Sequence, residues 1–189
     1  GIVCGEGAGI LLLESLESAQ ARNAPILAEI RGAAISSSPG SIAQPDAAAI
    51  AGCMRRTLDD AGVQPQDVAY VNAHATATEF GDIAEGQAIE AVFGSSVPVS
   101  SFKGHLGHTM AASGALESIL CIEMLQSSTY FPTRGLRNPD ARCGNLNHMC
   151  EHLHKPSGLV LKNSFALGGC NCTIIFDRLS ENSINVGKE

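Results

Sequence analysis

Strand-like segments alternate with amphipathic helical segments along almost the whole chain, and this alternation restricts the fold more than any other feature. The expected strands cover residues 26–36, 68–73, 97–101, 159–163 and 172–177, and the expected helices cover residues 47–61, 83–93 and 109–125. Strands that alternate with helices build a layered α/β fold. We therefore expect a mixed sheet with helices on its faces.

The acidic composition excludes several classes of partner. The 189 residues carry a formal net charge of −7 without a cluster of Lys and Arg, which argues against binding to nucleic acid or to a membrane surface. The apolar runs are far shorter than the roughly 20 residues that cross a bilayer, so no membrane span is expected. The chain opens in an apolar segment at Gly1, and we expect it to be a piece of a longer protein.

Seven cysteines are spread through apolar segments, and an odd number does not suit a disulfide framework. Buried thiols in a reducing cytosol fit better, so a cytoplasmic location is expected. Cys143, Cys150 and three nearby histidines could be imagined as a metal cluster. Their spacing matches no zinc pattern, and the alternation over residues 146–153 predicts a strand with exposed histidines, so no metal site is expected.

Side chains that can take part in catalysis lie in three polar segments, each of which follows an expected strand. These segments are residues 74–78, 100–108 and 163–169, and the middle one carries Lys103, His105 and His108. The ends of strands in sheets packed against helices are where reactive groups collect, so the three segments are expected to meet at one rim. A histidine just before a helix is biased towards its neutral form, because the helix N-terminus is positive.

Four motifs occur in these segments and near the start of the chain. They are Gly5-Glu6-Gly7-Ala8-Gly9, Val71-Asn72-Ala73-His74-Ala75-Thr76-Ala77-Thr78, Ser101-x-Lys103-x-x-x-Gly107-His108 and Asn163-Ser164-Phe165-x-x-Gly168-Gly169. Their order and spacing resemble the C-terminal half of a β-ketoacyl-acyl carrier protein synthase. The resemblance covers nearly the whole chain and is specific, unlike a lone glycine motif.

The resemblance implies a thiolase-like layered fold, of which this chain would hold the C-terminal half. Residues 1–25 would be the last hairpin and connecting helix of the N-terminal half, residues 26–178 the C-terminal ketosynthase domain, and residues 179–189 a polar tail. The nucleophilic cysteine would lie in the N-terminal half, since Cys4, Cys170 and Cys172 do not match its motif. The chain alone is therefore expected to be an incomplete and inactive part of an acyltransferase.

The implied reaction is a decarboxylative Claisen condensation in fatty acid or polyketide synthesis, without a cofactor. An acyl thioester is attacked by the enolate that forms when malonyl-carrier protein loses carbon dioxide, and negative charge develops on an oxygen. By the resemblance, His74 and His108 donate hydrogen bonds to that charge, as in an oxyanion hole. Lys103 would orient the histidines electrostatically, whereas His105 matches no catalytic position and is expected to pack the loop.

The remaining matched residues would support this centre. Glu117, a lone carboxylate on an apolar helical stretch, would pair with Lys103, while Thr76, Thr78 and Asn163 would complete the surroundings. Phe165, Gly168 and Gly169 resemble the family's gating loop. The sequence departs from the family at Ala75 and Ala77, where glycine and a small or hydroxylated residue are usual, and at Ala166 and Leu167 in the gating loop.

The partners implied are an acyl carrier protein bearing acyl and malonyl groups, the chain's own N-terminal half, and a second copy in a homodimer. Two alternatives remain open. A thiolase would share the Gly-His turn, but the Asn163-Ser164-Phe165 motif argues against it. A non-catalytic, chain-length-factor-like subunit of a ketosynthase heterodimer is the other, and the presence of both histidines favours the enzyme.

Overall fold

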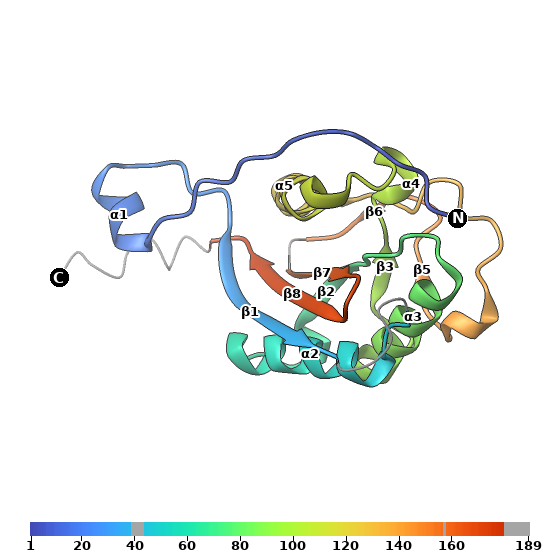
Figure 1. Ribbon diagram of the computed structural model, residues 1–189. Helices are drawn as coiled ribbons and strands as arrows, with labels where there is room; N and C mark the ends of the chain where they lie inside the picture. The colour runs from blue at the N-terminus through green and yellow to red at the C-terminus, as the bar shows by residue number, and fades with distance from the viewer. Residues whose placement is uncertain (39–43, 157, 180–189) are drawn as a thin grey trace.

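A six-stranded mixed sheet forms the centre of the computed structural model, which describes residues 1–38, 44–156 and 158–179 (Figure 1). Its order is β1-β8-β7-β2-β3-β5. β1 pairs antiparallel with β8 and β8 with β7, whereas the other neighbours are parallel. The strands are β1 (Glu29–Ser37), β2 (Val68–Asn72), β3 (Pro98–Ser100), β5 (Asn147–His148), β7 (Leu159–Ala166) and β8 (Cys170–Asp177). The expected α/β fold is confirmed.

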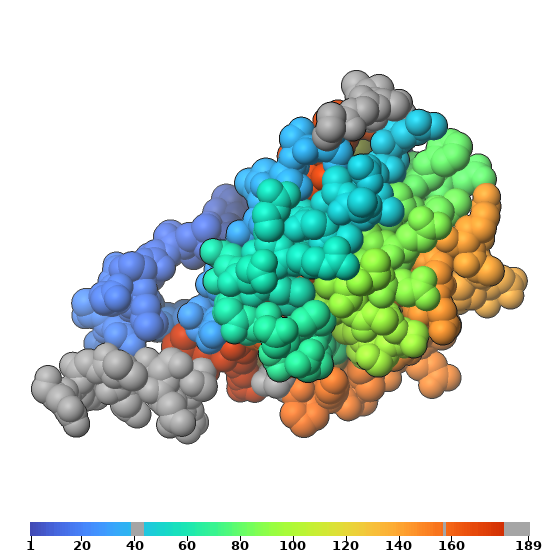
Figure 2. All heavy atoms as spheres, turned by 90° about the horizontal axis from the view of Figure 1, so that it is seen from below, coloured from blue at the N-terminus to red at the C-terminus, as the bar shows by residue number. Residues whose placement is uncertain are grey.

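Helices cover both faces of the sheet and make three layers (Figure 1). α2 (Ala47–Ala61) and α3 (Glu79–Phe93) lie side by side on one face, and Figure 2 views the molecule from their side. α5 (Ser113–Ser127) packs against β7 and β8 on the other face, near the single turn α4 (Lys103–Leu106). Two apolar cores result, one on each side of the sheet.

Short elements complete the described part of the chain. They are α1 (Leu16–Ala21), the 3-10 turns η1 (Pro65–Asp67), η2 (Met110–Ala112) and η3 (Ala141–Cys143), and a two-stranded sheet of β4 (Thr129–Tyr130) and β6 (Leu153–His154). Among the described residues, no helix is both long and apolar enough to cross a bilayer. The tail expected at residues 179–189 lies outside the described residues from position 180 onward.

Local signals account for the bounds of α2. The Asp46 carboxylate accepts a hydrogen bond from the Ala48 N–H at 2.8 Å, which caps the helix N-terminus. Gly62 ends the helix with φ of 66°, a left-handed conformation that glycine adopts without strain. Ile50 and Met54 are fully buried on one face of the helix, so both the boundaries and the apolar face agree with the sequence pattern.

The hairpin expected in residues 1–25 is absent, because residues 1–14 are extended and do not pair with one another. An isolated bridge joins Cys4 to His108, in which the His108 N–H donates to the Val3 carbonyl at 2.7 Å and the Gly5 N–H donates to the His108 carbonyl at 3.0 Å. The segment then crosses α5, and Ile10 remains 92% exposed. The apolar pattern predicted paired strands, but this chain gives them no neighbouring strand.

Three further expectations need correction. The apolar alternation over residues 146–153 does not form one strand, because β5 joins the main sheet while β6 pairs with β4. The helix after His108 begins only at Ser113, behind the η2 turn, so His108 does not lie at its N-terminus. Strands β7 and β8 also extend further than expected and form a hairpin, with Phe165 inside β7.

The three polar segments do meet at one rim, as expected. β2, β3 and β7 run parallel, so their carboxyl ends lie at the same edge of the sheet. Just beyond β2, the Ala73 N–H donates to the Ser100 carbonyl at 2.8 Å. The sheet register therefore places His74, Lys103 and Asn163 in one neighbourhood.

Candidate active site

His74 is held by a buried carboxylate from α3. Glu85 Oε1 accepts from the backbone N–H of His74 at 2.8 Å, and Oε2 accepts from that of Ala75 at 2.7 Å. Asn163 Nδ2 donates to the same Oε1 at 3.0 Å, and the Thr173 hydroxyl donates to Asn163 Oδ1 at 3.1 Å. Burial raises the pKa of Glu85, while these hydrogen bonds act in the opposite direction. Asn163 thus supports His74 through Glu85.

Lys103 lies between His74 and Glu117. Its Nζ is 2.5 Å from Glu117 Oε1 and 3.4 Å from His74 Nδ1, and both charged side chains are almost fully buried. An ammonium group can only donate hydrogen bonds, so His74 Nδ1 is the acceptor and the ring proton is on Nε2. Burial, followed by the charge of Lys103, lowers the pKa of His74 to about 2. His74 is neutral at physiological pH.

His108 is also neutral with its proton on Nε2, but other contacts hold it in this form. The Met110 N–H donates to His108 Nδ1 at 3.3 Å, which leaves the proton on Nε2. Burial, followed by Lys103, lowers the pKa of His108. Since His108 precedes η2 and not α5, these causes replace the helix N-terminus that the sequence suggested.

The two imidazoles face each other at the rim. Their ring centroids are 5.4 Å apart with an interplanar angle of 88°, and both carry their proton on Nε2. Two neutral N–H donors of this kind stabilise negative charge without bringing a proton that would neutralise it. The arrangement is chemically suited to an oxyanion formed between them.

Phe165 packs on His74 from the end of β7, with ring centroids 5.6 Å apart. The turn that follows contains Gly168 and Gly169, whose φ angles of 85° and 78° favour glycine. The Ser38 N–H donates to the Gly169 carbonyl at 2.8 Å, which fastens the turn to the end of β1. The predicted gating residues therefore form the end of a hairpin and not a free loop.

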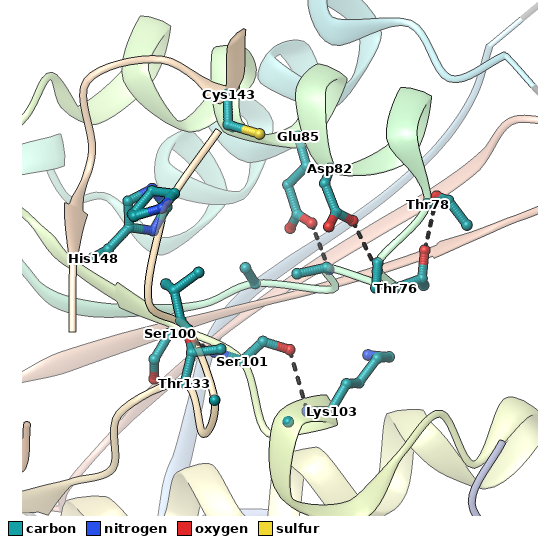
Figure 3. A pocket seen from close by; sticks show the side chains of 18 of the residues that line it. Thr76, Thr78, Asp82, Glu85, Ser100, Ser101, Lys103, Thr133, Cys143 and His148 are labelled. Atoms are coloured by element: carbon teal, nitrogen blue, oxygen red, sulfur yellow. Dashed lines mark hydrogen bonds between the residues drawn. The ribbon is translucent and has the colours of Figure 1, made fainter. Parts of the chain in front are cut away.

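Two cavities adjoin the histidines, with volumes of about 820 and 860 Å³. The first reaches Lys103 and the second reaches His74 and Phe165, while Thr76 and His108 line both. Figure 3 shows the first cavity, with Thr76 and Thr78 hydrogen-bonded to each other at 3.0 Å and Lys103 entering from α4. The threonines thus offer hydroxyl groups at the junction of both cavities.

His105, Cys4 and Cys143 line the first cavity, and Cys170 and Cys172 line the second. His105 Nε2 donates to the Pro132 carbonyl at 2.9 Å, as expected for a loop-packing residue. Cys53 and Cys121 are buried thiols, but Cys4, Cys150 and Cys170 are exposed, which corrects the expectation that the thiols are generally buried. Within the described ranges, no group of three or more His, Cys, Asp or Glu side chains is placed to hold a metal ion.

Both alanines that depart from the family's pattern adopt positive φ angles. Ala75 has φ of 30° and Ala77 has φ of 61°, a region in which a Cβ atom is strained. The Ala77 N–H donates to Asp82 Oδ1 at 3.1 Å, and the two bonds to Glu85 hold the preceding residues. These contacts keep the loop after His74 in place despite the strain.

Sequence reasoning missed two charged residues of the site, Glu85 and Lys162. Glu85 lies on α3 and its side chain is 3% exposed, and Lys162 lies on β7 and is 2% exposed. Lys162 Nζ is 3.6 Å from Glu117 Oε2. Lys162 directly follows three apolar strand residues at positions 159–161, and this charge in a strand is the signal that could have drawn attention to it.

The layered fold, its mixed sheet and the histidines at the strand ends define a thiolase-like α/β protein. The model of the β-ketoacyl synthase C-terminal domain matches residues 27–137, more than half of the chain. The chain therefore belongs to the β-ketoacyl synthase family.

Known proteins agree with this assignment. The chain is 38% identical over 180 residues to 3-oxoacyl-(acyl-carrier-protein) synthase I, chloroplastic, of Hordeum vulgare, covering 93% of this chain and 39% of that protein. The structure of the ishigamide ketosynthase/chain length factor matches with a TM-score of 0.91 and 37% identity, over 95% of this chain and 45% of that one.

A second solved structure is that of a type II polyketide synthase acyl-carrier protein in complex with its ketosynthase bound to the hexaketide. It matches with a TM-score of 0.83 and 30% identity, over 88% of this chain and 42% of that one. The chain therefore spans about two fifths of the length of the proteins it matches.

Proposed function

We propose that this chain supplies the histidine side of the active site of a β-ketoacyl-acyl carrier protein synthase. The reaction is the decarboxylative condensation of an acyl thioester with malonyl-carrier protein. The observation that carries the proposal is the pair of neutral imidazoles, His74 and His108, at a ring separation of 5.4 Å with both protons on Nε2. Loss of one such donor typically costs about a hundredfold or more in rate.

The charge that develops in this reaction suits the site. As malonyl-carrier protein loses carbon dioxide, electrons move onto the thioester oxygen and form an enolate. Two Nε2–H donors stabilise that oxygen without transferring a proton to it, because the neutral form of both rings persists at physiological pH. Lys103 adds a fixed positive charge beside His74, and Glu117 holds that charge in place.

The acyl group requires a nucleophile, which we place outside this chain. Since Cys4, Cys170 and Cys172 do not match the nucleophile's motif, we propose that a cysteine of the N-terminal half carries the thioester. In this division residues 1–25 belong with the N-terminal half, and residues 26–178 form the C-terminal domain. The share of the relatives that this chain covers supports the division.

The proposed partners are an acyl carrier protein and a second copy of the whole enzyme. One structural relative is a ketosynthase in complex with an acyl-carrier protein, and another is a ketosynthase/chain length factor. The second relative keeps open the alternative of a non-catalytic, chain-length-factor-like role, and the His74–His108–Lys103 geometry favours catalysis. Seven unpaired thiols favour a reducing compartment, and we propose the cytoplasm.

Release of carbon dioxide from malonyl-carrier protein tests the function in the complete enzyme. We expect His74→Ala and His108→Ala each to lower the rate by at least about a hundredfold, because each removes one donor to the enolate. His154→Ala, which removes an exposed imidazole of β6 outside both cavities, is the matched control and keeps the parent rate. Parent rates in both of the first two variants would contradict the proposal, and a complete enzyme without decarboxylation would support the chain-length-factor-like role.

A further inference from the structure

Lys162 brings a second cation to a site with one central carboxylate. Its Nζ is 3.6 Å from Glu117 Oε2, while Lys103 Nζ is 2.5 Å from Glu117 Oε1. Lys162 also donates to the Ser164 hydroxyl and, at 3.4 Å, to the Asn163 carbonyl. Both lysines are almost completely buried, so their charges are poorly screened by water.

The alternation of β7 explains why Lys162 meets Glu117. Val160 packs in the core beneath α5, whereas Leu161 packs in the core beneath α2 and α3. Since side chains alternate along a strand, Lys162 points towards α5 and Asn163 towards Glu85. Adjacent residues of one strand therefore support the site from opposite faces of the sheet.

The contacts of Lys162 lead to His74 along two routes. One route passes through Glu117 to Lys103, whose Nζ is 3.4 Å from His74 Nδ1. The other passes through Ser164 to its neighbour Phe165, whose ring packs on His74. The Lys162 ammonium group thus contacts Glu117, which binds Lys103, and Ser164, which precedes Phe165.

Burying this ammonium group is costly. Glu117 Oε2 makes no hydrogen bond to any described residue. The Lys162 charge is therefore compensated by this oxygen only across 3.6 Å. A buried cation shared with a carboxylate that already has a closer partner does not repay its desolvation by pairing alone. A purely structural strand would be better served by an apolar residue at this position.

We propose that Lys162 is a positioning residue, whose ammonium group holds Glu117 and Ser164 so that Lys103 and Phe165 keep His74 in its working orientation. The placement of the His74 ring does not depend on the proposed function, although the effect on catalysis rests on it. Lys162 does not line either cavity at the histidines and acts only through its neighbours.

The charge of Lys162 gives a direct way to observe this coupling. Burial lowers the pKa of Lys162 from its ordinary value of 10.5, while Glu117 opposes the shift. The titratable and charged groups around it are Glu117 and Cys121 of α5, Lys103 of α4, Cys172 of β8 and His74 after β2. The pKa of His74 is about 2, so a change in its ring signals above neutral pH reports a neighbour.

Nuclear magnetic resonance of histidine-labelled full chain, recorded from pH 6 to pH 10.5, tests the proposal. The ring signal of His74 is assigned by its loss in His74→Ala. We expect this signal to move in the parent as Lys162 loses its proton, at a pH below 10.5, and to lose that transition in Lys162→Met. Lys155→Met, which removes an exposed lysine, should keep the transition.

A transition that persists unchanged in Lys162→Met would overturn the proposal and assign the signal to another group. Ser164→Ala provides a second variant that changes only a small, partly exposed side chain, should Lys162→Met not fold. Loss of the hydroxyl acceptor destabilises the ammonium form, so the transition should move to lower pH. An unmoved transition in Ser164→Ala would likewise contradict the proposal.

Kinetics of the complete enzyme separate this inference from the proposed function. We expect Lys162→Met to lower kcat for decarboxylation by about tenfold while KM stays within about twofold, because the residue orients a donor and does not bind substrate. If the parent enzyme does not decarboxylate, the proposed function fails and the resonance experiment still decides the role of Lys162. Parent kcat in Lys162→Met would exclude the catalytic part of the inference.

Discussion

The Glu85 carboxylate accepts a hydrogen bond from the backbone N–H of His74 at 2.8 Å, and this contact holds the candidate catalytic residue by its main chain. The second oxygen of Glu85 binds the next N–H at 2.7 Å. Both bonds need an acceptor, and an ionised carboxylate accepts well at both oxygens. The orientation of the loop after β2 therefore depends on a residue of α3.

Glu85→Gln should destabilise the protein. The amide group of glutamine replaces one acceptor with a donor, which then faces a backbone N–H, so we expect the free energy of unfolding to fall by about 1–3 kcal/mol. Urea denaturation measures the change. Glu123→Gln, an exposed change on α5, is the matched control and should stay within about 0.5 kcal/mol of the parent. Equal stability of the two variants would show that the contacts to His74 contribute little.

Lys103→Met should raise the pKa of His108 towards its ordinary value of 6.5. Burial is the main cause of the lowered pKa and remains in the variant, but the second cause, the Lys103 charge, is removed. A larger fraction of His108 is then protonated in mildly acidic solution, where Nδ1 can no longer accept from the Met110 N–H. Titration of the ring signals measures the shift, and Lys155→Met should leave the His108 curve unchanged. A curve that does not move in Lys103→Met would contradict the electrostatic role of this lysine.

Ala77→Gly should stabilise the loop after His74. Ala77 has φ of 61°, where glycine lacks the steric penalty of a Cβ atom, and we expect the free energy of unfolding to rise by up to about 1 kcal/mol. Thermal unfolding measures the difference. The control is Ala48→Gly in the first turn of α2, where the same substitution should lower stability, by less than the roughly 1 kcal/mol of a helix interior. A loss of stability in both variants would mean that Ala77 carries no backbone strain.

The stability of the parent should rise with pH in the range just below 10.5, relative to that of Lys162→Met. In this range the folded protein has released the Lys162 proton, whereas the unfolded chain, with the ordinary pKa of 10.5, still holds it. The unfolded state binds more protons, so increasing pH favours folding. Urea denaturation at several pH values compares Lys162→Met with Lys155→Met, and identical slopes would refute the lowered pKa of Lys162.

Several features of the fold were predictable because their causes are local. Asp46 and Gly62 mark the ends of α2 by capping chemistry that depends on a few neighbouring residues. Short apolar runs predict the strands before His74 and Lys103, and parallel strands end at one edge of a sheet, so the two residues are expected to lie close together, as they do. The order and spacing of the four motifs also indicate the β-ketoacyl synthase family.

The hairpin expected near the start of the chain shows where this reasoning stops. Its apolar pattern is that of a strand, but a strand needs a partner, and here only the short bridge from Cys4 to His108 forms. The single strand expected over residues 146–153 is wrong for a similar reason, because β5 pairs with β3 in one sheet and β6 pairs with β4 in another. Backbone pairing is non-local, so periodicity alone does not decide it.

The candidate site likewise has residues that the sequence indicates and contacts that only the structure shows. The polar segments after the strands, together with the resemblance to the β-ketoacyl synthase family, point to His74, His108 and Lys103 as candidates for one centre. The tertiary structure alone showed that Glu85 holds the His74 loop and that Lys162 shares Glu117 with Lys103. These contacts join residues from separate helices and strands, and they depend on the sheet register and the placement of α3 and α5. The packing of the whole chain sets that geometry, so no short stretch of sequence contains it.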